Sequence, residues 1–377
     1  MRRIYLDNNA TTPIADSVRE ALAPFLREHY GNPSSSHPLG RACHEAVEDA
    51  RSRVAQLIGA TADEIVFTSG GSESNNLALK GVALAAWPAR GHIIISALEH
   101  PTVSEPARHL QRLGFDVSTI ACDAQGRIDP ADVRRAIRHD TLLLSVMHSN
   151  NEIGSVQAIG EIAKLCRAQG VLVHTDAAQS VGKLSVRADE LDVDLLTLAG
   201  HKLYAPKGIG ALYVRRGVSL EPLLHGAGQE SGVRSGTENV AGIVALGEAA
   251  RLANICQPAD AGRMAELRER LADRLFDALH PAQPINAPTA ERLPNTLSVN
   301  FRHVAGADLL RRVPEVHAST GAACHSSATP LSATLKSIGL SPEIGRGTVR
   351  LSLGRYTSED EIDAAASLLV AAWEAMV

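Results

Sequence analysis

A chain of 377 residues is longer than one hydrophobic core usually supports, and its composition, 45% hydrophobic and 21% charged, is that of an ordinary globular protein. A formal net charge of -5 offers no basic footprint, which argues against nucleic acid as a partner. No run of about 18 apolar residues occurs, and the N-terminal residues lack an apolar stretch, so we expect neither a membrane span nor a signal peptide.

The five cysteines are scattered along the chain, and none stands in a CxxC pair. An odd number of widely spaced cysteines argues against a disulfide framework and against a zinc cluster. We therefore expect a reduced, cytoplasmic protein. Free cysteines are usually small buried hydrophobic residues, and four of the five are expected to be of this kind: Cys43, Cys122, Cys166 and Cys256.

Short apolar runs alternate with longer helical patterns over most of the chain. Such alternation is typical of an α/β domain with a mainly parallel sheet, whose strands are covered on both faces and can be as apolar as TLLLSVM. Helical patterns lie between the runs, for example at 72–87 and 158–170. Seven strands are predicted, at 64–70, 92–98, 116–121, 141–150, 171–177, 194–202 and 209–215.

The pattern changes around residues 253–262, where a second unit is predicted to begin. We expect a large α/β domain at 15–255 and a smaller α+β domain composed of 1–14 and 256–377. The elements of the smaller domain are predicted to be a helix at 264–280, strands at 295–301 and 348–354, and a last helix at 359–377.

Polar residues that follow an apolar run are candidates for a site, because ligands of parallel α/β sheets bind beyond the carboxyl ends of the strands. After the run at 64–70, Gly70, Gly71 and Ser72 open a helix, whose free N–H groups attract a phosphate. A plain glycine turn with Ser72 as helix N-cap explains the same residues.

Two charged residues follow two other apolar runs. Asp176 ends the run at 171–177, and a carboxylate there either pairs with a protonated ring nitrogen or caps the next helix. Lys202 ends the run at 194–202, where it either reaches water or is held for chemistry. Burial lowers the pKa of a lysine and frees its amine to react with a carbonyl group.

His100 and Asn151 occupy comparable places after the runs at 92–98 and 141–150. An imidazole can stack on an aromatic ring, and an asparagine amide can bond a ring substituent or a carboxylate. A lone histidine is more often structural. What favours a shared site is that these groups all follow strands of the same predicted sheet.

A series of motifs carries a more specific signal over nearly the whole chain: YLDNNATTP, NPSSSHPLGR, FTSGGSESNN, NNEIG, VHTDAAQSVGK, GHKLYAPKGIGALYVR, RSGTENV, ACHSS and VRLSLGR. In this order they resemble the NifS/IscS-type cysteine desulfurases, which are class V aminotransferase-like enzymes of fold type I. Selenocysteine lyases share that framework.

The resemblance implies that Lys202 holds pyridoxal 5'-phosphate (PLP) covalently and acts as a catalytic residue. It implies that Asp176 pairs with the pyridine nitrogen and that Arg350 clamps the carboxylate of the substrate. The other residues that it implies are Gln179 on the ring hydroxyl, His100 stacked on the ring and assisting catalysis, Asn151 beside the ring and substrate, and Gly71, Ser72 and His201 on the phosphate, joined by Thr237 from the neighbouring subunit of a homodimer.

Cys324 lies in the polar stretch STGAACHSSATP, where the neighbouring His325 would favour the reactive thiolate. The resembled family places its sulfur-accepting cysteine there. The implied activity is the conversion of L-cysteine to L-alanine, with a persulfide on Cys324 that is passed to a sulfur-acceptor protein. The alternative is a selenocysteine lyase, which releases selenide and alanine from L-selenocysteine.

Two features depart from the commoner family pattern. The desulfurases usually have a serine where this chain has Ala199, so one hydrogen bond to the phosphate is missing or replaced, and selenocysteine lyases also have an apolar residue there. The chain ends at Val377, without the longer extension through which some members bind the scaffold protein of iron–sulfur cluster assembly. The sequence therefore does not predict that partner.

Three readings from other classes explain less. A metalloenzyme would draw on Asp176 and several histidines, yet no histidine pair has HxxxH spacing. A thiol hydrolase built on Cys324 leaves Lys202 and Asp176 unexplained, and a non-catalytic scaffold would be expected to have lost the lysine or the thiol. The histidines that the first reading would use are His100, His148, His174 and His201.

Overall fold

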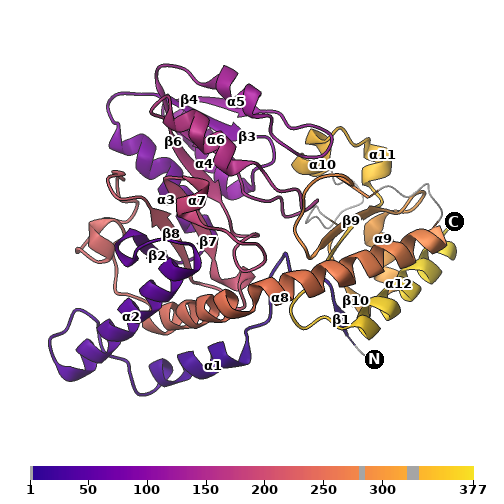
Figure 1. Ribbon diagram of the computed structural model, residues 1–377, viewed down its shortest axis with the longest axis horizontal. Helices are drawn as coiled ribbons and strands as arrows, with labels where there is room; N and C mark the ends of the chain where they lie inside the picture. Colours follow the sequence, from indigo (N-terminus) through magenta and orange to yellow (C-terminus); the bar gives the residue numbers. More distant parts are fainter. Residues whose placement is uncertain (1–2, 280–284, 321–330) are drawn as a thin grey trace.

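The computed structural model describes residues 3–279, 285–320 and 331–377. The strands of its largest sheet are β2 (Ile65–Thr68), β3 (His92–Ser96), β4 (Asp116–Ile120), β5 (Thr141–Ser145), β6 (Leu172–Asp176), β7 (Leu195–Ala199) and β8 (Gly210–Val214). They lie in the order β2-β8-β7-β6-β5-β3-β4, with β8 antiparallel to both neighbours and all other pairs parallel (Figure 1). The prediction of a mainly parallel, seven-stranded sheet is confirmed.

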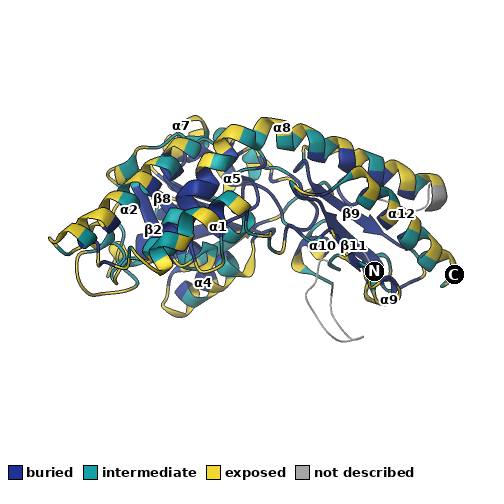
Figure 2. Ribbon diagram, turned by 90° about the horizontal axis from the view of Figure 1, so that it is seen from below, coloured by how far each residue is buried: buried dark blue, intermediate teal, exposed yellow. Residues whose placement is uncertain are grey.

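The helices around this sheet share one pattern, in which an apolar side faces the strands and a polar side faces solvent. Figure 2 shows the strands as buried and the outer sides of the helices as exposed. The helices before residue 240 are α1 (Asp16–Leu22), α2 (Pro38–Leu57), α3 (Gly71–Ala85), α4 (Pro101–Arg112), α5 (Pro130–Ala136), α6 (Ile159–Arg167) and α7 (Ala188–Leu191), with 3₁₀ turns η1 (Ala23–Leu26), η2 (Ala62–Glu64), η3 (Gly200–Lys202) and η4 (Glu230–Gly232).

Each face of the sheet has its own apolar cluster, because successive residues of a strand point to opposite faces. Ile93 and Ile95 of β3 belong to the cluster that contains Leu77 of α3 and Leu110 of α4. Ile94, between them, belongs to the cluster on the other face, with residues of α2 and α6. Covering both faces leaves the ends of the strands as the natural place for polar groups.

The longest helix, α8 (Val240–Leu279), has 40 residues and runs without interruption past Pro258. The sequence predicts a helix that starts at residue 264, and this start is wrong, because α8 already begins at Val240. Leu246 packs in the cluster beside the sheet, and Leu271 packs in a different one. Tertiary packing of both halves thus outweighs the local cost of a proline inside a helix.

The C-terminal part contains two small sheets. β1 (Ile4–Tyr5) pairs in parallel with β10 (Val316–His317), and β9 (Thr296–Asn300) pairs antiparallel with β11 (Thr348–Ser352). The cluster beneath them joins Leu6, Leu271 and Leu351. The other helices are α9 (Gly306–Arg312), α10 (Ala333–Ser337), α11 (Pro342–Gly345) and α12 (Glu359–Glu374).

The separate apolar clusters support a division into a large domain at 15–255 and a small one formed by 1–14 and 256–377, which we retain as a proposal. α8 passes through the proposed boundary. Among the helices that the structure describes, none combines the length and the apolar character that crossing a membrane requires.

Candidate active site

Asp176 and Lys202 stand at the carboxyl ends of two adjacent parallel strands. Asp176 is the last residue of β6 and lies opposite Thr197 of β7, and Lys202 ends the 3₁₀ turn that directly follows β7. The two groups lie close enough for the negative charge of Asp176 to act on the pKa of the Lys202 amine. The strand order therefore produces the juxtaposition that the sequence predicts.

The amine of Lys202 is held by the N-terminal segment. Its Nζ donates hydrogen bonds to the backbone oxygens of Asn9 and Ala10, the latter at 2.7 Å. Burial, together with the positive charge of Arg350, lowers the pKa of Lys202 to about 8, against the opposing charge of Asp176. At pH 7 roughly a tenth of this amine is therefore unprotonated and nucleophilic, far more than for a lysine of ordinary pKa, about 10.4.

Both oxygens of the Asp176 carboxylate have partners, although its side chain is only 7% exposed. Oδ2 accepts a hydrogen bond from Nδ2 of Asn75 at 2.7 Å, and Oδ1 accepts one from the backbone N–H of Ala178 at 3.0 Å. A turn follows β6 here, so the alternative of Asp176 as a helix cap does not apply. Each carboxylate oxygen can accept a further bond, which leaves capacity for a donor on a ligand.

The first turn of α3 lies beside the end of β7. Gly70 precedes the helix with a φ of 145°, a backbone conformation that favours glycine, and no side chain caps the helix. Ser72 is therefore not the N-cap. A Cβ on Gly71 would lie 3.3 Å from the Cβ of Ala199, whereas one on Gly70 would meet nothing within 4 Å. The start of this 15-residue helix thus opens onto space suited to an anion.

His100 caps the next helix. Its Nδ1 accepts the backbone N–H of Thr102 at 3.2 Å and lies 2.9 Å from the Thr102 hydroxyl. Burial lowers the pKa of His100, and the charges of Asp176 and Lys202 act on it in opposite directions. The structural role that sequence reasoning kept open is therefore real, and it coexists with a position next to Asp176 and Lys202.

Gln179 and His201 also approach the N-terminal segment. Nε2 of Gln179 donates to the backbone oxygen of Asn9 at 2.9 Å, and its Oε1 accepts from the buried Lys183 at 3.1 Å. Nδ1 of His201 lies 3.2 Å from the Thr11 hydroxyl. Burial lowers the pKa of His201 to about 4, with the Lys202 charge adding to the effect, so this ring is neutral at physiological pH.

Arg350 reaches the same region from β11. It pairs with Asp7 at 2.7 Å and donates to the backbone oxygen of Asn151 at 3.0 Å. Its Nε is buried and has no hydrogen-bond partner among the described residues. A buried guanidinium with an unused donor is suited to bind a carboxylate.

Two further predicted residues are Thr237 and Cys324. Thr237 is exposed, on the segment before α8, and makes no hydrogen bond to the other site residues within the described part of the chain. Cys324 lies outside the described residues. The structure does describe what flanks it: Ser319 pairs with the backbone of Arg350, and the Ser332 hydroxyl donates to Glu152 at 2.6 Å.

Sequence reasoning gave no role to four residues that make contacts here: Asp7, Asn9, Asn75 and Lys183. Two could have been found from helical or turn spacing. Asn75 follows Gly71 by four residues on α3, which places both on one side of the helix, and Lys183 follows Gln179 by four residues. Asn9 contributes through its backbone oxygen, which leaves no signal in its side chain.

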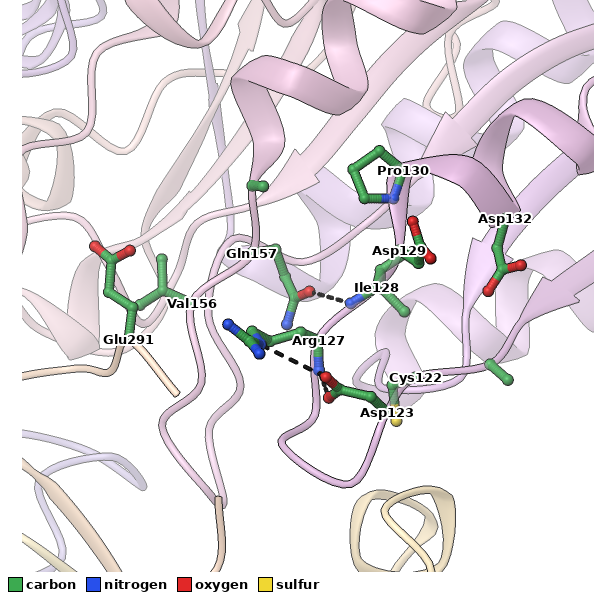
Figure 3. A pocket seen from close by; sticks show the side chains of 12 residues that line it. Cys122, Asp123, Arg127, Ile128, Asp129, Pro130, Asp132, Val156, Gln157 and Glu291 are labelled. Carbon is green, nitrogen blue, oxygen red and sulfur yellow. Dashed lines mark hydrogen bonds and ion pairs between the residues drawn. The ribbon is translucent and has the colours of Figure 1, made fainter. Parts of the chain in front are cut away.

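The cavity in Figure 3, of about 560 Å³, lies elsewhere, beside α5, and none of the predicted site residues lines it. It contains the partly exposed Cys122, one of two cysteines (with Cys256) that are less buried than expected. Burial and the charge of Asp123 raise the pKa of Cys122, so its sulfur stays a protonated thiol. Among the described residues, no three His, Cys, Asp or Glu side chains are arranged to hold a metal.

Comparisons with known proteins agree with one another. The model of the family "Aminotransferase class-V" matches residues 4–365. "Cysteine desulfurase IscS" of Dictyoglomus turgidum is 44% identical over 364 residues, which is 96% of this chain and 92% of that protein. Among solved structures, "NIFS-LIKE PROTEIN" has a TM-score of 0.92 at 35% identity and covers 98% of both chains. "SspA in complex with cysteine" has a TM-score of 0.83 at 37% identity, over 94% of this chain and 99% of that one.

Proposed function

This chain belongs to the aminotransferase class-V family and is a PLP-dependent cysteine desulfurase, and on that premise we propose how its residues carry out the reaction. The observation that carries the proposal is the placement of the Lys202 amine and the Asp176 carboxylate at adjacent strand ends. The substrate is L-cysteine, the ligand that one similar structure names in its title. The selenocysteine lyase alternative is not favoured, since the relatives cited are named cysteine desulfurases.

The described residues fit PLP, a flat pyridine that carries an aldehyde, a hydroxyl and a phosphate. We assign the aldehyde to Lys202, the ring nitrogen to Asp176 and the ring hydroxyl to Gln179. The space that opens beyond Gly70 is suited to the phosphate, which the N–H groups of Gly71 and Ser72 would bind together with His201. His100 would lie against the face of the ring.

When bound, PLP supplies an electron sink for the carbon that bears the substrate amine. Arg350 binds the substrate carboxylate with its free Nε. Its guanidinium also donates to the backbone oxygen of Asn151, so Asn151 lies beside the bound substrate. Lys202, whose pKa is about 8, removes the proton from that carbon as a general base. His100 assists the later proton movements.

Cys324 accepts the sulfur. Its thiolate attacks the sulfur of the substrate, the carbon–sulfur bond breaks, and its electron pair stays with the carbon and is protonated. L-Cysteine and the enzyme thiol thus become L-alanine and an enzyme persulfide, with no external oxidant. A sulfur-acceptor protein would then receive the terminal sulfur, which places the enzyme in iron–sulfur cluster assembly. We further propose a cytoplasmic homodimer, in which Thr237 of one subunit reaches the phosphate in the other.

The proposed activity is tested by incubating the purified protein with L-cysteine and a thiol reductant. We expect alanine and sulfide in a one-to-one ratio, loss of both when PLP is stripped from the protein, and recovery of both when PLP is added. Pyruvate in place of alanine would contradict the proposal, because it would show β-elimination and not transfer of the sulfur atom.

The lowered pKa of Lys202 predicts how fast PLP attaches to the stripped protein. Attachment requires the unprotonated amine, so its rate should rise as the pH increases through about 8 and then level off. A lysine of ordinary pKa, about 10.4, would show a rate that still climbs at pH 10. Rapid-mixing absorbance measurements across this range distinguish the two, and a rate that does not level off would contradict the assignment.

A further inference from the structure

One buried amide side chain bonds Asp176 directly and is linked to His100 through Thr102. Asn75, on α3, is 1% exposed. Its Nδ2 donates to Oδ2 of Asp176 at 2.7 Å and to the Thr102 hydroxyl at 2.8 Å. An amide nitrogen carries two hydrogens, so these two bonds use its entire donor capacity.

The orientation of this amide follows from the charge of its partner. An ionised carboxylate only accepts hydrogen bonds, so the nitrogen of Asn75, and not its oxygen, must face Asp176. Oδ1 of Asn75 then points away, and it is buried without a partner among the described residues. An unsatisfied buried carbonyl is costly, which indicates that the bond to Asp176 decides the orientation.

The second bond continues to His100. Because the Thr102 oxygen accepts from Asn75, the Thr102 hydroxyl can donate its own hydrogen to Nδ1 of His100, which lies 2.9 Å away. The backbone N–H of Thr102 donates to the same nitrogen at 3.2 Å. With Nδ1 occupied as an acceptor, a neutral His100 carries its proton on Nε2, and two donors of one residue hold the ring in place.

We propose that Asn75 is a positioning residue that holds the Asp176 carboxylate and, through Thr102, the His100 ring as one unit. The inference rests on the proposed function, in which Asp176 and His100 contact the cofactor. In this proposal Asn75 acts through Asp176 and Thr102, and not directly on the cofactor or the substrate. The two bonds of Asn75, here called its arms, lead to different predictions. Loss of the arm to Asp176 should weaken cofactor binding, and loss of the arm to His100 through Thr102 should slow turnover.

Two substitutions separate the arms. Asn75→Leu removes both bonds at similar volume, and we expect the PLP dissociation constant to rise roughly tenfold or more, as for loss of a hydrogen bond to a charged group. The pH titration of the absorbance of bound PLP should also shift, because that absorbance reports the surroundings of the ring. Thr102→Val removes only the hydroxyl, and we expect kcat to fall several-fold with the PLP affinity and the KM for cysteine within about twofold of wild type.

The double variant tests whether the groups act as a unit. Once Asn75 is Leu, the Thr102 oxygen has lost the donor that turns its hydrogen toward Nδ1 of His100, so adding Thr102→Val should change kcat little further. Thr102→Ser alone keeps the hydroxyl and should keep the wild-type kcat. Asn286→Leu serves as the matched control. That buried amide bonds Ser298 and Asn300 in the small sheet, so its loss should lower the melting temperature without moving the PLP dissociation constant or the absorbance titration.

The outcomes are decisive in both directions. Wild-type PLP affinity and titration in Asn75→Leu, or additive losses of kcat in the double variant, would overturn the proposal. If Asn75→Leu does not fold, Thr102→Val and its serine counterpart still decide the arm to His100. A wild-type protein that binds no PLP would instead refute the proposed function, a result that no comparison among the variants can mimic.

Discussion

Replacement of Lys202 by alanine is expected to eliminate both the covalent hold on PLP and the turnover of cysteine. The same amine attaches the cofactor and moves the proton, so no other step can compensate for its loss. General-base catalysis alone contributes roughly 10²–10⁴-fold, and the loss of attachment adds to it. The measurements are alanine formation and the visible absorbance of PLP after gel filtration, both of which should fall to background.

The control for this variant is Lys164→Ala. Lys164 is exposed in the last turn of α6, before the amino end of β6, so its removal takes away a lysine charge at the end of the sheet opposite the proposed site. We expect near wild-type absorbance and activity. Residual alanine formation in Lys202→Ala at more than a few per cent of the wild-type rate would show that another group carries the cofactor chemistry.

Replacement of Cys324 by serine is expected to leave PLP bound and to abolish sulfur transfer from cysteine. The serine hydroxyl cannot accept sulfur as a persulfide, so the carbon–sulfur bond has no acceptor. The flanking contacts support this role, since Ser319 pairs with the backbone of Arg350, at 2.7 Å from the Arg350 N–H to its oxygen.

The measurement for this variant is persulfide formation, which mass spectrometry of the protein detects after brief exposure to L-cysteine. Wild type should gain the mass of one sulfur, and the Cys324→Ser protein should gain none. Cys122→Ser is the matched control. Burial raises the pKa of the Cys122 thiol, so we expect this thiol to be unreactive and its replacement to leave persulfide formation unchanged. Undiminished persulfide in Cys324→Ser would remove Cys324 from the mechanism.

Local patterns predicted the sheet because its strands are short, apolar and separated by helical stretches. The run containing Ile93, Ile94 and Ile95 became a strand buried on both faces, as its composition indicates. The same reasoning failed for the start of α8, because the change of pattern at 253–262 predicts a helix that begins at residue 264, whereas the helix begins at Val240. Packing of residues far away in sequence against both halves of α8 decided that element, and no local pattern reports such packing.

For the site, the sequence predicts side chains at the ends of strands of one sheet, and Asp176 and Lys202 follow the adjacent strands β6 and β7. The partners of those side chains were harder to anticipate. The Lys202 amine donates to the backbone oxygens of Asn9 and Ala10, and Ala10 lies 192 residues earlier in the chain. A backbone oxygen is present at every position, so only the fold reveals which one is used. The role of each site residue remains a proposal.

The continuity of α8 has a consequence for cooperativity. One helix supplies Leu246 to the interior beside the large sheet and Leu271 to the interior beside the small ones. Loss of either apolar cluster would destabilise α8, a helix of 40 residues and about 60 Å, which also packs in the other cluster. We therefore expect the two halves to unfold together, in one cooperative transition.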